Sequence, residues 1–225
     1  MSDLSAFPIA SRWTAQHPDR LQLYSFPTPN GVKISIALEE IGLPYEAHKV
    51  DIMKNESWGK EFLALNPNGK IPVIVDSEGP GGAPIIITES AAILIYLGEK
   101  FGKLIPVDPI ERVRMFEWMF FHASGLGPAF GNSGYFQKLA PSPSPHAVER
   151  FSAEARRTLS VLNHRLGQVE YLAGDYSIAD ILNFGWIWRK EFAGVDFDEA
   201  PNVARWYSSL EQRDAVKTAI TKLTS

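Results

Sequence analysis

Two short segments of the chain combine residue types that can hold an anion at the start of a helix. Thr28-Pro29-Asn30-Gly31 precedes one stretch of helical periodicity, and Thr88-Glu89-Ser90 precedes another. A helix N-terminus presents backbone N–H groups without intrahelical partners and about half a positive charge, so it can bind a carboxylate or a thiolate. The same residue types are good helix caps, and capping is the simpler explanation of either segment taken alone.

The Ile71-Pro72 bond could supply a second kind of binding group. A cis peptide before a strand would expose the Ile71 N–H and C=O to an extended ligand. Only about 5–6% of X-Pro bonds in folded proteins are cis, so the bond taken alone is expected to be trans.

The chain contains no cysteine, which excludes disulfide scaffolds, thiolate metal sites and cysteine nucleophiles. Any thiol chemistry must therefore use a bound thiol. No phosphate loop, dinucleotide fingerprint or serine-hydrolase elbow occurs. The histidines lack the spacing of metal ligands, so no metal is expected; they are His17, His48, His122, His146 and His164.

The composition is that of an ordinary globular protein. Its 22 basic and 26 acidic side chains give a net charge of -4, and no block of like charges argues for nucleic acid or an anionic membrane surface as a partner. The most apolar stretches, 84–97 and 116–130, are interrupted by polar residues and fall short of the ~20 residues that span a membrane. Residues 1–20 lack the apolar centre of a secretory signal, so we expect a cytoplasmic protein with an irregular N-terminal extension.

The pattern of strands and helices predicts two domains. Residues 21–104 alternate between strand and helix in the order β-α-β-α-β-β-α, which is typical of a thioredoxin-like domain. The pattern predicts a strand at 70–76, an antiparallel hairpin around the glycine-rich residues 79–82, and a helix at 89–101. Residues 111–225 form the second domain, which is expected to be all-helical because helical periodicity occurs at 112–121, 146–166, 177–188 and 201–210, with almost no strand-like alternation. Within them Ser177-Ile178-Ala179-Asp180 is a capping box, in which the serine and aspartate side chains satisfy N–H groups at a helix start.

These features occur together in an order that resembles the glutathione S-transferase superfamily. The similarity is carried by Leu23–Gly31, Asn66–Val73, Glu89-Ser90 at a helix start, and Ser177–Asp180, and it extends from about Leu21 to the C-terminus. The Thr-Pro-Asn-Gly turn is similar to the nu class, to bacterial disulfide-bond oxidoreductases and to Ure2-like proteins. The resemblance implies an α/β thioredoxin-like N-terminal domain, an all-α C-terminal domain and a homodimer.

The resemblance also implies a role for individual residues in binding glutathione. The backbone of Ile71, with Pro72 in cis, would pair with the cysteinyl unit, and Glu89 with Ser90 would hold the γ-glutamyl ammonium and carboxylate. Lys70 would contact the glycyl carboxylate, and Arg150 matches an arginine that closes the site. Ser57 stands where relatives often have a glutamine that contacts the ligand.

Thr28 and Asn30 fall where the family places the groups that face the glutathione sulfur, and we expect them to be the catalytic residues. Tyr24 and Ser25 lie near the same turn and are an alternative pair, although Tyr24 is expected within a strand. The implied activity is glutathione-dependent reduction of small disulfides, with peroxide reduction or conjugation to electrophiles as further activities. The alternative is a glutathione-binding regulatory protein of Ure2 type without catalysis.

Overall fold

The computed structural model describes residues 7–224, so residues 1–6 of the expected N-terminal extension lie outside the described part. The chain divides into two compact units, which are described separately. One contains residues up to Lys100 together with the C-terminal residues from Thr218, and the other contains Phe101–Lys217.

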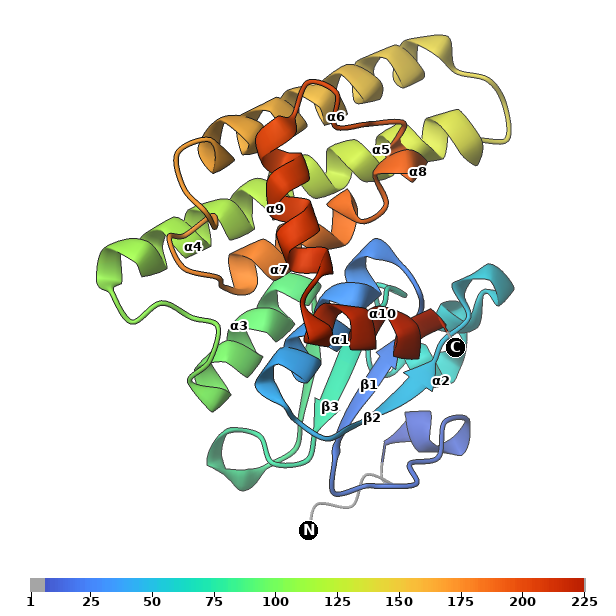
Figure 1. Cartoon of the computed structure of the whole chain (residues 1–225). Helices are drawn as coiled ribbons and strands as arrows, with labels where there is room; N and C mark the ends of the chain where they lie inside the picture. Colours follow the sequence, from blue (N-terminus) through green and yellow to red (C-terminus); the bar gives the residue numbers. More distant parts are fainter. Residues whose placement is uncertain (1–6, 225) are drawn as a thin grey trace. The chain divides into compact units, whose positions relative to one another are not determined.

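The first unit is built on a sheet of four strands in the order β2-β1-β3-β4 (Figure 1). β1 is parallel to β2 and antiparallel to β3, and β3 pairs with β4 in the predicted antiparallel hairpin. This is the mixed sheet of a thioredoxin-like domain, which confirms the predicted fold class. The strands are β1 (Leu21–Ser25), β2 (Tyr45–Lys49), β3 (Val73–Asp76) and β4 (Ile85–Thr88).

Helices cover both faces of this sheet. α1 (Pro29–Ile41) and α3 (Ser90–Phe101) lie over one face, and the short α2 (Lys60–Leu63) lies on the other (Figure 1). Single-turn 3-10 helices connect these elements at Pro8–Ser11, Ile52–Lys54, Glu56–Trp58 and Pro80–Gly82. Successive strand residues point to opposite faces, so Tyr24 packs with Phe62 of α2 while its neighbours Leu23 and Ser25 face the other side.

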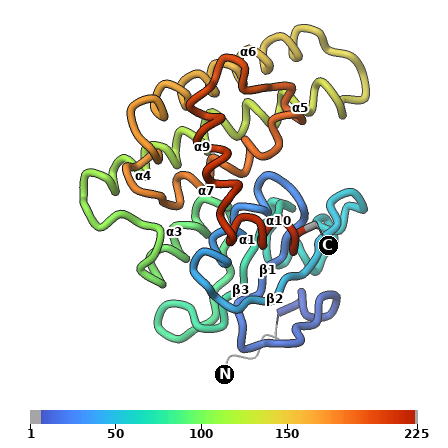
Figure 2. Tube along the Cα trace, in the orientation of Figure 1, coloured from blue at the N-terminus to red at the C-terminus, as the bar shows by residue number. Residues whose placement is uncertain are grey.

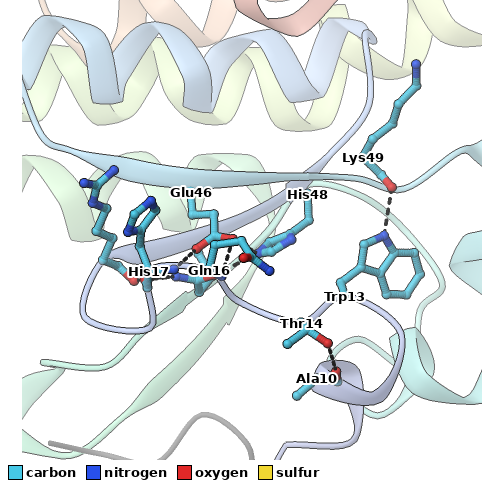
Figure 3. A network of polar contacts seen from close by, with 10 residues as sticks. Ala10, Trp13, Thr14, Gln16, His17, Glu46, His48 and Lys49 are labelled. Carbon is cyan, nitrogen blue, oxygen red and sulfur yellow. Dashed lines mark hydrogen bonds and ion pairs between the residues drawn. The ribbon is translucent and has the colours of Figure 1, made fainter.

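The N-terminal segment is attached to the edge strand β2 (Figure 3). The Glu46 carboxylate accepts hydrogen bonds from the backbone N–H of Gln16 at 2.8 Å and of His17 at 2.7 Å. The Trp13 indole N–H donates to the Lys49 carbonyl at 2.9 Å. The described part of the extension is therefore an ordered segment that follows the sheet edge.

The second unit is entirely helical within the residues that the structure describes. α4 continues through a π-helical turn at His122–Leu126 into α5, and α5 packs along α6 (Figure 2). Loop residues 139–144, which are rich in proline, connect α5 to α6. The helices are α4 (Pro109–Phe121), α5 (Gly127–Lys138), α6 (Pro145–Leu166), α7 (Ile178–Ile187), α8 (Lys190–Ala193), α9 (Pro201–Glu211) and α10 (Asp214–Thr224), of which α10 ends in the first unit.

The predicted capping box is present at the start of α7. The Ser177 hydroxyl accepts from the Ala179 N–H at 3.3 Å, and the Asp180 carboxylate accepts from the Ser177 N–H at 3.0 Å. Asp180 also accepts from the Leu172 N–H at 3.0 Å and from the Trp206 indole at 2.9 Å. One buried carboxylate thereby joins α7 to the preceding loop and to α9.

Within residues 7–224, every helix is too short or too polar to cross a membrane. Among the same residues there is no group of three or more acidic, histidine or cysteine side chains arranged to hold a metal ion.

Candidate glutathione site

The first unit contains a small pocket of about 60 Å³ where the start of α1, the loop before β3 and the start of α3 meet. Six of the eight residues predicted for ligand binding line it. Its lining residues are Asn30, Asn66, Lys70, Ile71, Pro72, Glu89 and Ser90.

The Ile71-Pro72 peptide is cis, as the family resemblance implied and against the ordinary preference of an isolated X-Pro bond for trans. Asn66 shapes the loop before it: its side-chain amide donates to the Lys70 carbonyl at 2.7 Å and accepts from the Asn68 N–H at 3.0 Å. Both bonds fix the backbone that carries Lys70 and Ile71 to the pocket. Asn66 begins the Asn66–Val73 motif, but this contribution was not predicted from the sequence.

Glu89 and Ser90 stand at the N-terminus of α3. Glu89 adopts the left-handed backbone conformation, with φ of 66°, and its carbonyl accepts the first helical hydrogen bond, from Ile93 at 2.9 Å. The helix therefore begins at Ser90 and not at Glu89 as the periodicity predicted. This placement brings the exposed Glu89 carboxylate next to the positively polarised N-terminus of α3. A ligand that carries both an ammonium and a carboxylate group would find a complementary charge for each.

The start of α1 is held tightly against β1. Thr28 is the N-cap residue, and its hydroxyl oxygen accepts from the Gly31 N–H at 3.1 Å. Pro29 occupies the first helical turn, where its missing N–H costs nothing. A Cβ at Gly31 would lie 2.4 Å from the Ser25 hydroxyl oxygen and 2.2 Å from the Phe26 carbonyl oxygen, so this close approach requires glycine.

Asn30 reaches the pocket from the first turn of α1, and Lys33 lies behind it. The Lys33 ammonium donates to the Asn30 side-chain oxygen at 2.7 Å. Lys33 is 1% exposed, and burial lowers its pKa to about 7 although the nearby charge of Glu89 raises it. Lys33 was not predicted as a site residue; the signal in the sequence was its position among the mostly apolar residues 32–38.

The other residues considered from the sequence do not line the pocket. Ser57 is buried in the 3-10 turn Glu56–Trp58 and does not line the pocket. Tyr24 is within β1 as expected, and burial raises its pKa well above the usual range of a phenol, which makes it a poor proton acceptor at neutral pH. Arg150 is exposed on α6 of the helical unit.

Comparison with known protein families identifies the class. Residues 28–100 match the model of the glutathione S-transferase N-terminal domain, and residues 126–214 match that of the C-terminal domain. The chain belongs to the glutathione S-transferase family.

Three relatives place the chain more closely within that family. It is 41% identical to the disulfide-bond oxidoreductase YfcG of Escherichia coli over 206 residues, which cover 90% of this chain and 95% of that protein. A glutathione transferase from Burkholderia graminis, solved with two glutathione molecules bound per subunit, has a TM-score of 0.92 and 46% identity, covering 98% of this chain and 95% of its own. One from Pseudomonas putida, solved with one glutathione disulfide per subunit, has a TM-score of 0.92 and 43% identity, covering 97% and 98%.

Proposed function

We propose that the chain binds glutathione in the pocket of the first unit and uses it to reduce small disulfides. The observation that supports this proposal most is that the Glu89 carboxylate and Ser90, at the N-terminus of α3, line the same pocket as Ile71. Glu89 takes the γ-glutamyl ammonium, and Ser90 with the helix end takes the γ-glutamyl carboxylate. The pocket, of about 60 Å³, is small beside the roughly 300–1,000 Å³ of pockets that enclose a drug-sized ligand, so we expect it to hold one end of the tripeptide.

The rest of glutathione then extends from this pocket along the loop before β3. The Ile71 N–H and C=O pair with the cysteinyl unit, and the exposed Lys70 contacts the glycyl carboxylate. We assign Arg150 to closure of the site, from the family resemblance. Thr28 and Asn30 act as donors to the sulfur, since neither side chain can act as a base near neutral pH.

The chemistry proceeds on two glutathione thiols because the protein has none of its own. The first thiolate attacks one sulfur of the substrate disulfide, which forms a mixed disulfide and releases the other half as a thiolate that takes up a proton. The second thiolate attacks the glutathione sulfur of the mixed disulfide, which yields oxidised glutathione and the second substrate thiol. Relatives that bind two glutathione molecules or one glutathione disulfide support this route.

We also assign the chain to the nu class, on the basis of the Thr28–Gly31 turn, and to the cytoplasm, where glutathione is kept reduced. Peroxide reduction and conjugation to electrophiles would use the same activated sulfur.

The test of this function is turnover of hydroxyethyl disulfide with glutathione, measured beside conjugation of chlorodinitrobenzene. We expect disulfide turnover to survive treatment with iodoacetamide followed by removal of the reagent, because the chain offers no cysteine to alkylate. A cysteine-dependent thiol transferase treated in parallel should lose its activity. If the protein bound glutathione but turned over neither substrate, the proposed catalytic activity would be contradicted. A regulatory protein of Ure2 type would then be favoured.

We further propose that the protein is a homodimer. α4 exposes three large apolar side chains at helical spacing: Ile110 is 72%, Val113 is 64% and Phe120 is 67% exposed. The other aromatic residues of α4 are only partly exposed; they are Phe116, Trp118 and Phe121. Sedimentation at micromolar concentration should therefore give a species of about 50 kDa, twice the 25.0 kDa of one chain. A species of 25.0 kDa would contradict the dimer.

A further inference from the structure

Lys33 is unusual among the charged residues of this protein. It is the one Lys or Arg that is buried in the described part of the chain, at 1% exposure. Burying an ammonium group is unfavourable compared with an apolar side chain of similar volume. It lies on the second turn of α1, next to residues that fill the core. Filling the core would not by itself require a lysine at this position.

The contact between Lys33 and Asn30 determines how the Asn30 amide is oriented. An ammonium group donates hydrogen bonds and cannot accept them. The Asn30 atom at 2.7 Å from the Lys33 Nζ is accordingly the side-chain carbonyl oxygen. The amide NH2 of Asn30 is then directed away from Lys33, and Asn30 lines the pocket. The group that Asn30 can offer to a ligand is a donor, which a thiolate needs.

The charge of Lys33 acts in the same direction. Burial lowers the pKa of this ammonium to about 7, and the nearby Glu89 carboxylate opposes that effect. A bound thiolate would add a second negative charge on the side of Asn30. Opposite charges within a few ångströms favour each other's ionised forms, so the thiolate and the ammonium would stabilise one another.

We propose that Lys33 is a positioning residue for the glutathione thiolate, which holds the Asn30 amide with its N–H groups toward the sulfur and adds a positive charge behind it. This inference rests on the proposed function, in which Asn30 contacts the sulfur. It adds Lys33 to the residues that serve this function, although Lys33 is not proposed to contact glutathione.

The test is ultraviolet thiolate absorbance against pH for glutathione bound to the wild-type protein and to variants of the two residues. Lys33→Met should raise the pKa of the bound thiol by about one unit, because it removes both the charge and the donor to Asn30. Lys33→Gln should raise it less, since its amide can still donate to Asn30. In an Asn30→Ala background, Lys33→Met should raise the pKa by less than it does in the wild-type background, because only the effect of the charge remains to be removed.

The control is Lys54→Met, which removes a lysine whose side chain is 76% exposed and should leave the titration unchanged. Thiol titration curves of both Lys33 variants that coincide with wild type would overturn the inference while leaving the proposed function intact. Equal shifts from Lys33→Met with and without Asn30 would show that Lys33 does not act through that residue, and would overturn it too. A wild-type protein that binds no glutathione would overturn the proposed function and this inference together.

Discussion

Replacement of Glu89 by glutamine should weaken glutathione binding by about 10- to 100-fold. A hydrogen bond to a charged group contributes about 1.5–3 kcal/mol, and about 1.4 kcal/mol corresponds to a factor of ten in affinity. Glutamine keeps the shape of the side chain at this left-handed backbone position but removes its charge. The γ-glutamyl ammonium would then lose its charged partner.

Calorimetric titration with glutathione measures this change directly. The matched control is Glu99→Gln, which neutralises another exposed carboxylate on α3 at the far end of the same helix. Its affinity should equal that of the wild type, which separates a local effect from a change in overall charge. Equal affinities of Glu89→Gln and the wild-type protein would exclude Glu89 from the site.

Replacement of Asp180 by alanine should lower the free energy of unfolding by roughly 3 kcal/mol or more. The Asp180 carboxylate accepts hydrogen bonds from Leu172, Trp206 and both the backbone and the hydroxyl of Ser177. Each buried donor left without an acceptor costs about 1–3 kcal/mol. Burial raises the pKa of Asp180 to about 6, partly opposed by these bonds, so the group is ionised at pH 7.5 or above.

The loss should appear as a lower urea midpoint with an unchanged slope, followed by tryptophan fluorescence. Asp175→Ala is the matched control, because Asp175 is exposed in the loop just before α7. It should unfold at the wild-type midpoint. Equal midpoints of Asp180→Ala and Asp175→Ala would show that the buried carboxylate adds nothing to stability.

The pocket residues that could be predicted from the sequence are those at positions where the backbone conformation restricts which residue types are accepted. Pro72 marks the loop before β3, and Glu89-Ser90 and Asn30 mark helix starts, because caps and turns accept few residue types. The strands of the hairpin were likewise predictable from β-branched residues on both sides of a glycine-rich turn. The beginning of β3 was not: the expected strand from Lys70 starts only at Val73.

Other features depend on tertiary contacts that no local pattern contains. Lys33 stands among mostly apolar residues in the sequence, but its burial at 1% exposure and its contact with Asn30 appear only in the fold. α5 was not predicted because it holds several glycines, which lower helix propensity. One of them, Gly134, is needed there because a Cβ would lie 2.1 Å from the Phe192 ring. The glycine that weakens the local signal thus permits the packing that stabilises the helix.

The attachment of the N-terminal segment to β2 has a consequence for the behaviour of the protein at high concentration. A strand at the edge of a sheet can recruit a strand from another molecule, which is a common first step in aggregation. Here the Trp13 indole N–H donates a hydrogen bond to the Lys49 carbonyl of β2 (Figure 3). The Glu46 carboxylate accepts hydrogen bonds from the backbone N–H groups of Gln16 and His17, which keeps the segment beside the same strand. The described part of this segment, which contributes no residue to the pocket, should thereby hinder intermolecular pairing at this edge, and a chain shortened to begin at β1 should lose that protection.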